Sequence, residues 1–202
     1  KCWGSNSSGD LGDGTTTDRW IPTGVSGLAG GAQAVSAGMW HTCALTTAGG
    51  VKCWGDRSVG QLGNNTVYGY SSVPVDVSDL SGVISISAGG MHTCALTVAG
   101  GIKCWGSNSN GELGDGTTTD RPAPVHVSGL TSGVQAVTAG IGHTCALTDA
   151  GGVKCWGSNY LGELGDGTTT ERYAPVDVVG LSSGITAISA GGEHTCALTA
   201  TG

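Results

Sequence analysis

Short runs of alternating apolar and polar residues recur along the chain and predict β-strands. Residues 133–139 alternate small apolar and polar side chains, with the period of two that is typical of a half-buried strand. Residues 124–127 alternate in the same way behind a leading proline, and proline suits an edge strand, where the ladder needs no amide. We therefore expect 124–127 to be the outermost strand of a sheet and 133–139, with its small side chains, to be the innermost.

A hairpin over residues 41–55 is expected to supply the two middle strands of such a sheet. Residues 47–49, Thr-Ala-Gly, fit a three-residue loop whose glycine adopts a left-handed conformation and forms a bulge. Counting outward from this loop, Cys43 faces Cys53 at a non-hydrogen-bonded pair. Opposed Cα atoms at such a pair lie about 4.5 Å apart, a distance at which a disulfide can form.

The chain is a tandem repeat with a period of 51 residues. Cysteines and histidines keep this step throughout the sequence: Cys2, Cys53, Cys104 and Cys155; Cys43, Cys94, Cys145 and Cys196; His41, His92, His143 and His194. A period near 50 that contains about four short strands and no helix signal predicts an all-β fold, a β-propeller. We expect one β-propeller-type repeat domain over 1–202, with four roughly four-stranded blades. Their units are 1–51, 52–102, 103–153 and 154–202.

Each unit carries one motif in register: Gly-Val-Lys-Cys-Trp-Gly-Ser-Asn-x-x-Gly-Glu-Leu-Gly-Asp-Gly-Thr, then Pro-Val, then Ala-Gly-x-x-His-Thr-Cys-Ala-Leu. In this motif the chain resembles the regulator-of-chromosome-condensation repeat family. The resemblance implies a β-propeller fold and protein binding as the common function, but it does not imply a particular reaction. Members of that family include nucleotide exchange factors, chromatin-binding proteins and bacterial inhibitors that plug enzyme clefts.

Composition and charge narrow the range of partners. The formal net charge is −7, which opposes binding to nucleic acids, because Lys and Arg neutralise their phosphates. This acidity and the paired cysteines also distinguish the chain from the best-known nuclear member of the family. No apolar run approaches the roughly 18 residues of a membrane-spanning segment. We expect no nucleic-acid partner and no membrane span.

The cysteines indicate an oxidising compartment, so we expect a secreted or cell-surface protein. Three pairs lie opposite each other within hairpins: Cys43 and Cys53, Cys94 and Cys104, Cys145 and Cys155. A zinc site is a weaker interpretation, because metal sites usually contain Cys-x-x-Cys pairs, whereas each hairpin offers two opposed sulfurs.

Cys2 and Cys196 have no partner ten residues away in the chain. Cys196 occupies the repeat position of Cys43 and Cys2 that of Cys53, so the two could form the missing pair. A bond between them within one chain closes a ring of four blades. The same bond between chains gives a closed dimer or an open filament. A further interpretation is that the units are an excerpt of a longer array. In each case the terminal strands are complementary.

The repetition argues against metal and catalytic sites. Four equivalent histidines around an axis are one possible metal site, but a backbone hydrogen bond that fixes the turn explains a recurring His better. Residues 9–18 resemble a calcium loop, yet they lack the alternating carboxylates and final Glu of an EF-hand. Turn chemistry explains that loop. A reacting group needs a unique set of partners, so we expect no enzyme, no cofactor and no metal, and we place His126, which is not a copy, on a solvated face.

Binding residues are expected where the copies differ. Four different residue pairs precede the repeated histidines at one turn, and the second unit is irregular over residues 56–59 and 64–70. Neutral sequence drift in the loops is the alternative explanation for these differences. The candidate partner-binding residues are Trp20, Met39, Trp40, Arg57, Tyr68, Tyr70, Met91, Ile141, Tyr160, Tyr173 and Glu193.

The preferred functional hypothesis is an extracellular, non-enzymatic scaffold that binds proteins and assembles through its complementary ends. Exposed aromatic residues in the irregular loops support a glycan-binding propeller as the alternative. Inhibition of a secreted enzyme is a third hypothesis, which the family resemblance alone implies.

Overall fold

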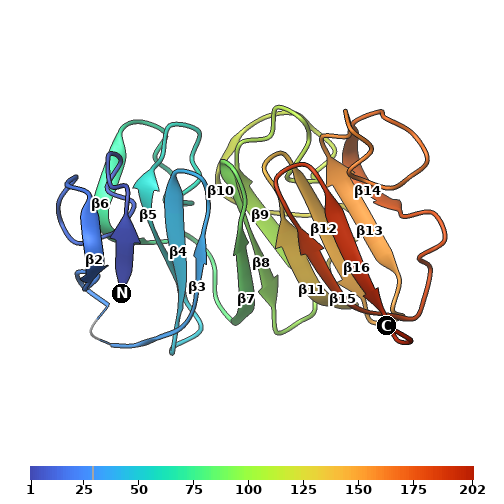
Figure 1. The fold of residues 1–202 in the computed structure, drawn as a ribbon, viewed down its shortest axis with the longest axis horizontal. Coiled ribbons are helices and arrows are strands. Elements are labelled where there is room, and N and C mark those ends of the chain that lie inside the picture. The colour runs from blue at the N-terminus through green and yellow to red at the C-terminus, as the bar shows by residue number, and fades with distance from the viewer. Residues whose placement is uncertain (29) are drawn as a thin grey trace.

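The computed structural model describes residues 1–28 and 30–202, and these residues form strands joined by turns and loops (Figure 1). The strands are β1 (Cys2–Gly4), β2 (Arg19–Thr23), β3 (Ala32–Ala37), β4 (His41–Thr46), β5 (Val51–Asp56), β6 (Tyr70–Asp76), β7 (Val83–Ala88), β8 (His92–Thr97), β9 (Ile102–Gly106), β10 (Arg121–His126), β11 (Val134–Ala139), β12 (His143–Thr148), β13 (Val153–Gly157), β14 (Arg172–Asp177), β15 (Ile185–Ala190) and β16 (Thr195–Thr199). Across the described ranges no helix is both long and apolar enough to cross a bilayer. The predicted all-β class is confirmed.

The strands form three complete antiparallel sheets, β3 to β6, β7 to β10 and β11 to β14, each a four-stranded blade in chain order. The first strands of neighbouring sheets lie against one another, since β7 contacts β3 and β11, and β11 contacts β15. The last strand of each sheet forms the opposite edge. At that edge β10 carries Pro122 and Pro124, which donate no amide to a ladder. The predicted positions of the innermost and outermost strands are confirmed.

The hairpin between β4 and β5 has the predicted loop and register. Gly49 has φ of 76°, a left-handed value that glycine adopts without a steric penalty. The amide of Thr46 donates to the carbonyl of Gly50 at 2.8 Å. Cys43 is opposite Cys53 with a Cα–Cα distance of 4.1 Å, and the two sulfurs are bonded. The hairpins of the next two blades carry the equivalent disulfides, Cys94–Cys104 and Cys145–Cys155.

Removing one of these disulfides should destabilise the fold. A bridge across ten residues contributes about 2.5–3 kcal/mol by the loop-entropy estimate. Replacing Cys94 and Cys104 together by serine is expected to lower the free energy of unfolding by about that amount in urea titrations. Cys2→Ser, which changes a free thiol, is the control. Equal stability of the double variant and this control would show that the bridge does not constrain the unfolded chain.

The two ends of the chain each form part of a blade. The units counted from residue 1 begin inside a blade, because β1 and β2 form only the outer half of a sheet and β15 and β16 only the inner half. The chain thus contains three complete blades and two complementary half-blades. The predicted bond between Cys2 and Cys196 is absent within this chain: both are free thiols, and the termini lie at opposite ends of the array (Figure 1). This structure therefore does not show closure of four blades within one chain.

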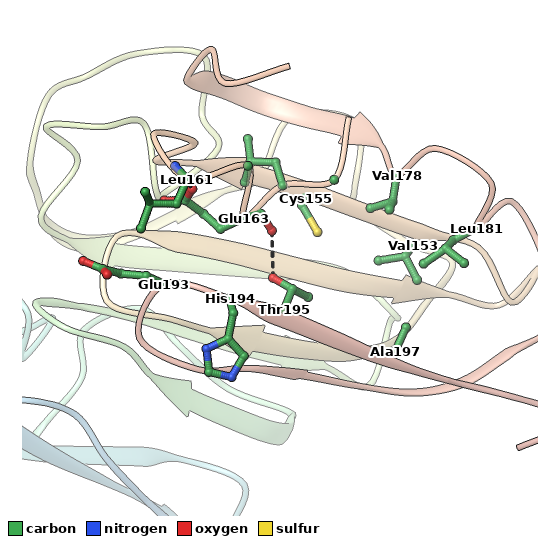
Figure 2. A pocket seen from close by; sticks show the side chains of 13 residues that line it. Val153, Cys155, Leu161, Glu163, Val178, Leu181, Glu193, His194, Thr195 and Ala197 are labelled. Atoms are coloured by element: carbon green, nitrogen blue, oxygen red, sulfur yellow. Dashed lines mark hydrogen bonds between the residues drawn. The ribbon is translucent and has the colours of Figure 1, made fainter. Parts of the chain in front are cut away.

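The core lies in thin layers between adjacent sheets. Trp105 of β9 and Ala95 of β8 pack against Cys43, Leu45 and Cys53 of the preceding sheet. Trp54, Trp105 and Trp156 are fully buried in equivalent places. Beyond the last complete sheet the same position is a pocket of about 250 Å³ in the described structure (Figure 2).

Candidate functional site

A buried asparagine organises the long loop that follows Trp-Gly in three of the four repeats. The side-chain amide of Asn108 donates to the carbonyls of Thr117 and Thr119, both at 3.1 Å. Its amide oxygen accepts from the backbone N–H of Leu113 at 3.0 Å. Asn6 and Asn159 make the same contacts in their own loops. One side chain thus holds the loop closed with three hydrogen bonds.

The carboxylate at the tip of this loop accepts hydrogen bonds from residues of the same loop. Asp13 accepts from the hydroxyl of Thr15 at 2.6 Å and from the guanidinium of Arg19 at 2.7 Å. These bonds, the Thr15 hydroxyl first, lower the pKa of Asp13 to about 2. The calcium-like carboxylates therefore serve turn chemistry, as predicted. Among the described residues no three His, Cys, Asp or Glu side chains gather as a metal site would require.

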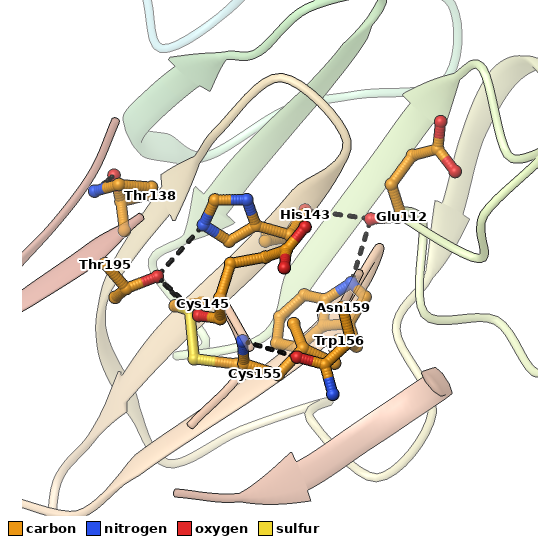
Figure 3. The surroundings of a disulfide bond; sticks show 12 residues. Glu112, Thr138, His143, Cys145, Cys155, Trp156, Asn159 and Thr195 are labelled. Carbon is orange, nitrogen blue, oxygen red and sulfur yellow. Dashed lines mark hydrogen bonds between the residues drawn. A yellow bond between two sulfur atoms is a disulfide. The ribbon is translucent and has the colours of Figure 1, made fainter. Parts of the chain in front are cut away.

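A main-chain carbonyl of the loop also accepts hydrogen bonds from the next blade. The carbonyl oxygen of Glu112 accepts from the indole N–H of Trp156 at 2.9 Å and from the hydroxyl of Thr144 at 2.8 Å (Figure 3). Gln61 binds Trp105 and Thr93 in the same way one blade earlier. These carbonyls were not predicted to have a role, because a main-chain acceptor leaves no signal in residue identity.

Gly114 of the loop lies so close to Trp156 that its substitution should destabilise the fold. A Cβ on Gly114, where φ is 67°, would lie 2.7 Å from the indole nitrogen of Trp156. At Gly133, where φ is 77°, a Cβ would meet open space. Gly133→Ala is therefore expected to cost about 1–2 kcal/mol, the left-handed penalty alone. Gly114→Ala should cost a further 1–3 kcal/mol, roughly, because of overpacking. Chemical unfolding of both variants measures the difference, and equal losses would contradict the tight contact.

The repeated histidines join blades rather than fixing turns through the backbone. The imidazole Nε2 of His41 pairs with the hydroxyl of Thr93 at 2.8 Å, and His92 pairs with Thr144 at 2.9 Å. The predicted backbone hydrogen bond is thus wrong: the partner is a side chain of the next blade. The threonine directly follows a histidine in every repeat, which is the signal that sequence analysis missed. Burial lowers the pKa of His41 to about 4 and that of His92 to about 3.

The turns before these histidines form one row, which we call the pre-histidine turns: residues 39–40, 90–91, 141–142 and 192–193. The amide of Met39 donates to the carbonyl of Gly89 at 3.2 Å, and that of Ile141 donates to Gly192 at 3.1 Å. Neighbouring turns are therefore linked from blade to blade. Met39, Trp40 and Ile141 remain about half exposed, so the row presents apolar side chains to solvent.

The pattern of the regulator of chromosome condensation (RCC1) repeat matches four segments of the chain, residues 2–45, 48–96, 100–147 and 150–198. A second pattern for the same repeat matches 32–61, 83–112 and 134–163. The chain belongs to the RCC1 repeat family. The resemblance found in the sequence is confirmed.

Two relatives resemble this chain over part of their own length. It is 37% identical over 167 residues to the human probable E3 ubiquitin-protein ligase HERC3, covering 81% of this chain and 16% of the relative. It is 34% identical over 209 residues to the Arabidopsis thaliana ultraviolet-B receptor UVR8, covering 99% of this chain and 47% of the relative. The chain thus spans less than half of either protein.

Two solved structures share the fold. Human WBSCR16 superposes with a TM-score of 0.85 at 26% identity, over 98% of this chain and 52% of that chain. Prp20p of Saccharomyces cerevisiae superposes with a TM-score of 0.82 at 21% identity, over 96% of this chain and 50% of that chain. These neighbours are β-propellers, so the propeller architecture is shown.

The remaining candidate residues occupy different RCC1 repeats. Arg57 donates from Nε to the carbonyl of Tyr68 at 2.7 Å, so it shapes its own loop. Tyr68 and Tyr70 are exposed in that second loop. Trp20 is exposed on β2, Tyr160 and Tyr173 are exposed in the last repeat, Met91 is half-buried and Glu193 is exposed. Blade-to-blade backbone bonds of Met39 and Ile141 run along the pre-histidine turns, where the candidates Trp40, Met91 and Glu193 also lie.

Proposed function

We propose that this RCC1 repeat chain is an extracellular protein-binding propeller module and not an enzyme. The exposed row of pre-histidine turns carries the proposal, because Met39, Trp40 and Ile141 present apolar surface on a scaffold whose repeated positions are buried. Contiguous apolar surface marks interaction sites on soluble proteins, and aromatic residues and Met are enriched at interfaces.

Relatives support binding as the general role. UVR8 is named as a receptor, and Prp20p is described by its binding to Gsp1p and histones. HERC3 is named as a probable ligase, but the match covers 16% of its length. We therefore carry over protein binding and not a reaction.

The polar groups of the repeats support a non-enzymatic role because they already serve structure. Imidazoles pair with threonine hydroxyls of the next blade, as in His41 with Thr93. Loop carboxylates pair with arginine and threonine, as in Asp115 with Arg121 and Thr117. The His–Thr pair occurs three times and the Asp–Arg pair occurs in three of the four loops, whereas catalysis needs one distinctive set of partners.

The three hairpin disulfides support an oxidising location, secreted or on the cell surface. Differential alkylation of the protein isolated from its natural source tests this part. We expect six cysteines to be protected until reduction. Full alkylation without reductant would overturn the assignment.

Partner capture from the natural extracellular medium tests the binding role. The double variant Met39→Asp and Ile141→Asp introduces charge into the pre-histidine turns and should reduce capture of a defined partner at least about tenfold, since central interface residues dominate affinity. Val98→Asp is the matched control, because Val98 is an exposed apolar residue in a hairpin turn. Undiminished capture by the double variant would overturn the proposed surface.

Glycan binding and self-assembly are two further proposals that do not depend on the pre-histidine turns. Exposed Tyr68 favours glycan binding as a second candidate. Sugar binding that is lost on Tyr68→Ala or Trp40→Ala would support it over protein binding. We also propose that copies of the chain assemble through their complementary half-blades.

A further inference from the structure

We propose that residues 57–70, which we call the second-repeat loop, recognise an acidic side chain of a protein partner. Arg57 supplies the positive charge for this contact, and the exposed side chains of Tyr68 and Tyr70 supply aromatic surface in the same loop. This inference rests on the protein-binding role in the proposed function and adds the chemistry of the partner.

The second-repeat loop lacks the acidic residues of the equivalent loops. Residues 6–19, 108–121 and 159–172 each contain three acidic residues and one arginine. In the second-repeat loop Gln61, Asn64 and Gly69 stand at the three acidic positions, and Arg57 is the only charged residue. The chain as a whole has a formal net charge of −7, so this loop is positively charged on an acidic protein.

Arg57 differs from the other arginines of the chain because it has no carboxylate partner. The others each bind an aspartate of their own loop at 2.7 Å: Arg19 with Asp13, Arg121 with Asp115 and Arg172 with Asp166. Among the described residues Arg57 forms no ion pair. The neighbouring Asp56 accepts instead from the amide of Ser58 at 2.7 Å and from the side-chain amide of Gln61 at 3.1 Å. The charge of Arg57 is therefore available to a ligand.

Hydrogen bonds within the loop orient the guanidinium of Arg57. Its Nε donates to the carbonyl of Tyr68 at 2.7 Å, and the main-chain amide of Arg57 donates to the carbonyl of Gly69 at 3.1 Å. In the described part of the chain Nε is the guanidinium nitrogen that is bonded, so the two terminal amino groups remain as donors. A carboxylate can accept from both of them in a bidentate arrangement.

The next blade fixes the tip of the loop. The amide of Asn65 donates to the carbonyl of Pro122 on β10 at 2.9 Å. A Cβ on Gly60 would lie 2.5 Å from the Cα of Pro122. Both contacts join the complete sheets β3 to β6 and β7 to β10. The site is thus formed in the free protein, and a partner does not have to order the loop on binding.

The second-repeat loop adjoins the row of pre-histidine turns. The amide of Asp56, directly before the loop, donates to the carbonyl of Trp40 in the first of these turns at 2.8 Å. Tyr68 is 82% exposed and Tyr70 is 51% exposed, and Tyr and Arg are enriched among the residues that dominate protein interfaces. A peptide segment that lies on the apolar row can place an acidic residue at Arg57. This continuity favours a protein segment over an acidic saccharide as the occupant.

The other loops disfavour the same segment. Asp18, Asp120 and Glu171 stand where the second-repeat loop has Gly69, and like charges at a contact act against the wrong position as well as the wrong partner. An acidic segment is therefore directed to the second repeat, although the scaffold of the repeats is alike.

Selection from a random nonapeptide library displayed on phage tests the site on the full 202-residue chain. We expect the selected peptides to be enriched in Asp and Glu over the unselected library. Replacing the acids of a selected peptide by their amides should weaken its binding at least about tenfold, since the arginine then lacks its charged acceptor. Selected peptides without acidic enrichment, or equal affinity of the acid and amide forms, overturn the proposal.

Substitutions in the loops identify the residue that binds the acid. Arg57→Gln removes the charge and should weaken the selected acidic peptides at least about tenfold. Asn64→Asp retains the size of the side chain and returns a carboxylate to the position that binds arginine in the other loops, so it should weaken them as well. Arg121→Gln is the matched control, because Arg121 already binds Asp115, and it should leave affinity unchanged. Equal weakening by Arg57→Gln and Arg121→Gln, or full affinity in Asn64→Asp, contradicts recognition by Arg57.

Polygalacturonate is the probe for an acidic saccharide as occupant. If it binds and Arg57→Gln abolishes this binding, while selected peptides show no acidic enrichment, the loop recognises a saccharide and the proposed peptide segment is wrong. Binding of acidic peptides alone supports the protein partner.

The proposed function and this inference fail separately. Partner capture that depends on Met39 and Ile141, together with peptide binding that is indifferent to Arg57, overturns the loop site alone. Acidic-peptide binding that depends on Arg57, together with capture that is unaffected by substitutions at Met39 and Ile141, overturns the pre-histidine surface alone.

Discussion

Trp105→Ala is expected to lower the free energy of unfolding by about 3–5 kcal/mol, the range for large aromatic truncations in a core. The side chain is fully buried and packs with Cys43 and Leu45 of the preceding sheet. Its loss leaves a cavity between two blades, and it removes the indole N–H that binds the carbonyl of Gln61. Urea unfolding followed by far-ultraviolet circular dichroism measures the effect.

Two controls separate packing from the hydrogen bond. Trp105→Phe retains much of the buried ring but no indole donor, so we expect a smaller loss of about 1–3 kcal/mol. Tyr160→Ala truncates an exposed aromatic residue and should change stability by less than about 0.5 kcal/mol. If Trp105→Ala were as mild as Tyr160→Ala, the layered core between the blades would be wrong.

Acidification from pH 6.5 to pH 4 should weaken the fold by several kcal/mol. Burial lowers the pKa of His41 to about 4 and that of His92 to about 3, whereas an unfolded histidine has its ordinary value of about 6.5. Between these values the unfolded chain binds protons that the folded chain does not, so stability falls as pH falls. Each buried imidazole contributes up to about 3 kcal/mol to this loss, at about 1.4 kcal/mol per pH unit.

Carboxylates also change the pH dependence of stability: some make the fold less stable in acid, and one has the opposite effect. Hydrogen bonds from Thr15 and Thr168 hold the pKa of Asp13 and Asp166 at about 2, so their stabilising contribution is lost below about pH 4. Burial raises the pKa of Glu112, and its protonation in the folded state opposes the loss as the pH falls towards the ordinary glutamate value. The histidine contribution is therefore lost at higher pH than the contribution of Asp13 and Asp166.

Unfolding free energies at pH 7, 6 and 5 test the histidine contribution. His92→Gln should be less stable at pH 7, because its partner Thr144 loses the imidazole, but its stability should fall less steeply with acid. Val98→Ala changes an exposed side chain that has no ionisable group and should keep the original slope. A His92→Gln profile parallel to that of the unmodified chain would rule out His92 as a source of the acid sensitivity.

The blade interior was predictable because local geometry decides it. Gly49 closes a short loop, and the alternation of opposed pairs then places Cys43 against Cys53. Pro122 and Pro124 keep β10 at an edge, since neither can donate to a further strand. The contact from His41 to Thr93 was not predictable in the same way, because the two residues are 52 positions apart and meet only after neighbouring blades pack.

The sequence by itself determined the repeat, the strand order within a blade, the hairpin pairing and the membership in the RCC1 family. Each depends on residues that are close in the chain or on a pattern that recurs with a fixed period. Only the tertiary structure decided how the blades join. The packing of neighbouring sheets places the indole of Trp156 against the carbonyl of Glu112, and no residue pattern within one repeat encodes how two sheets pack together.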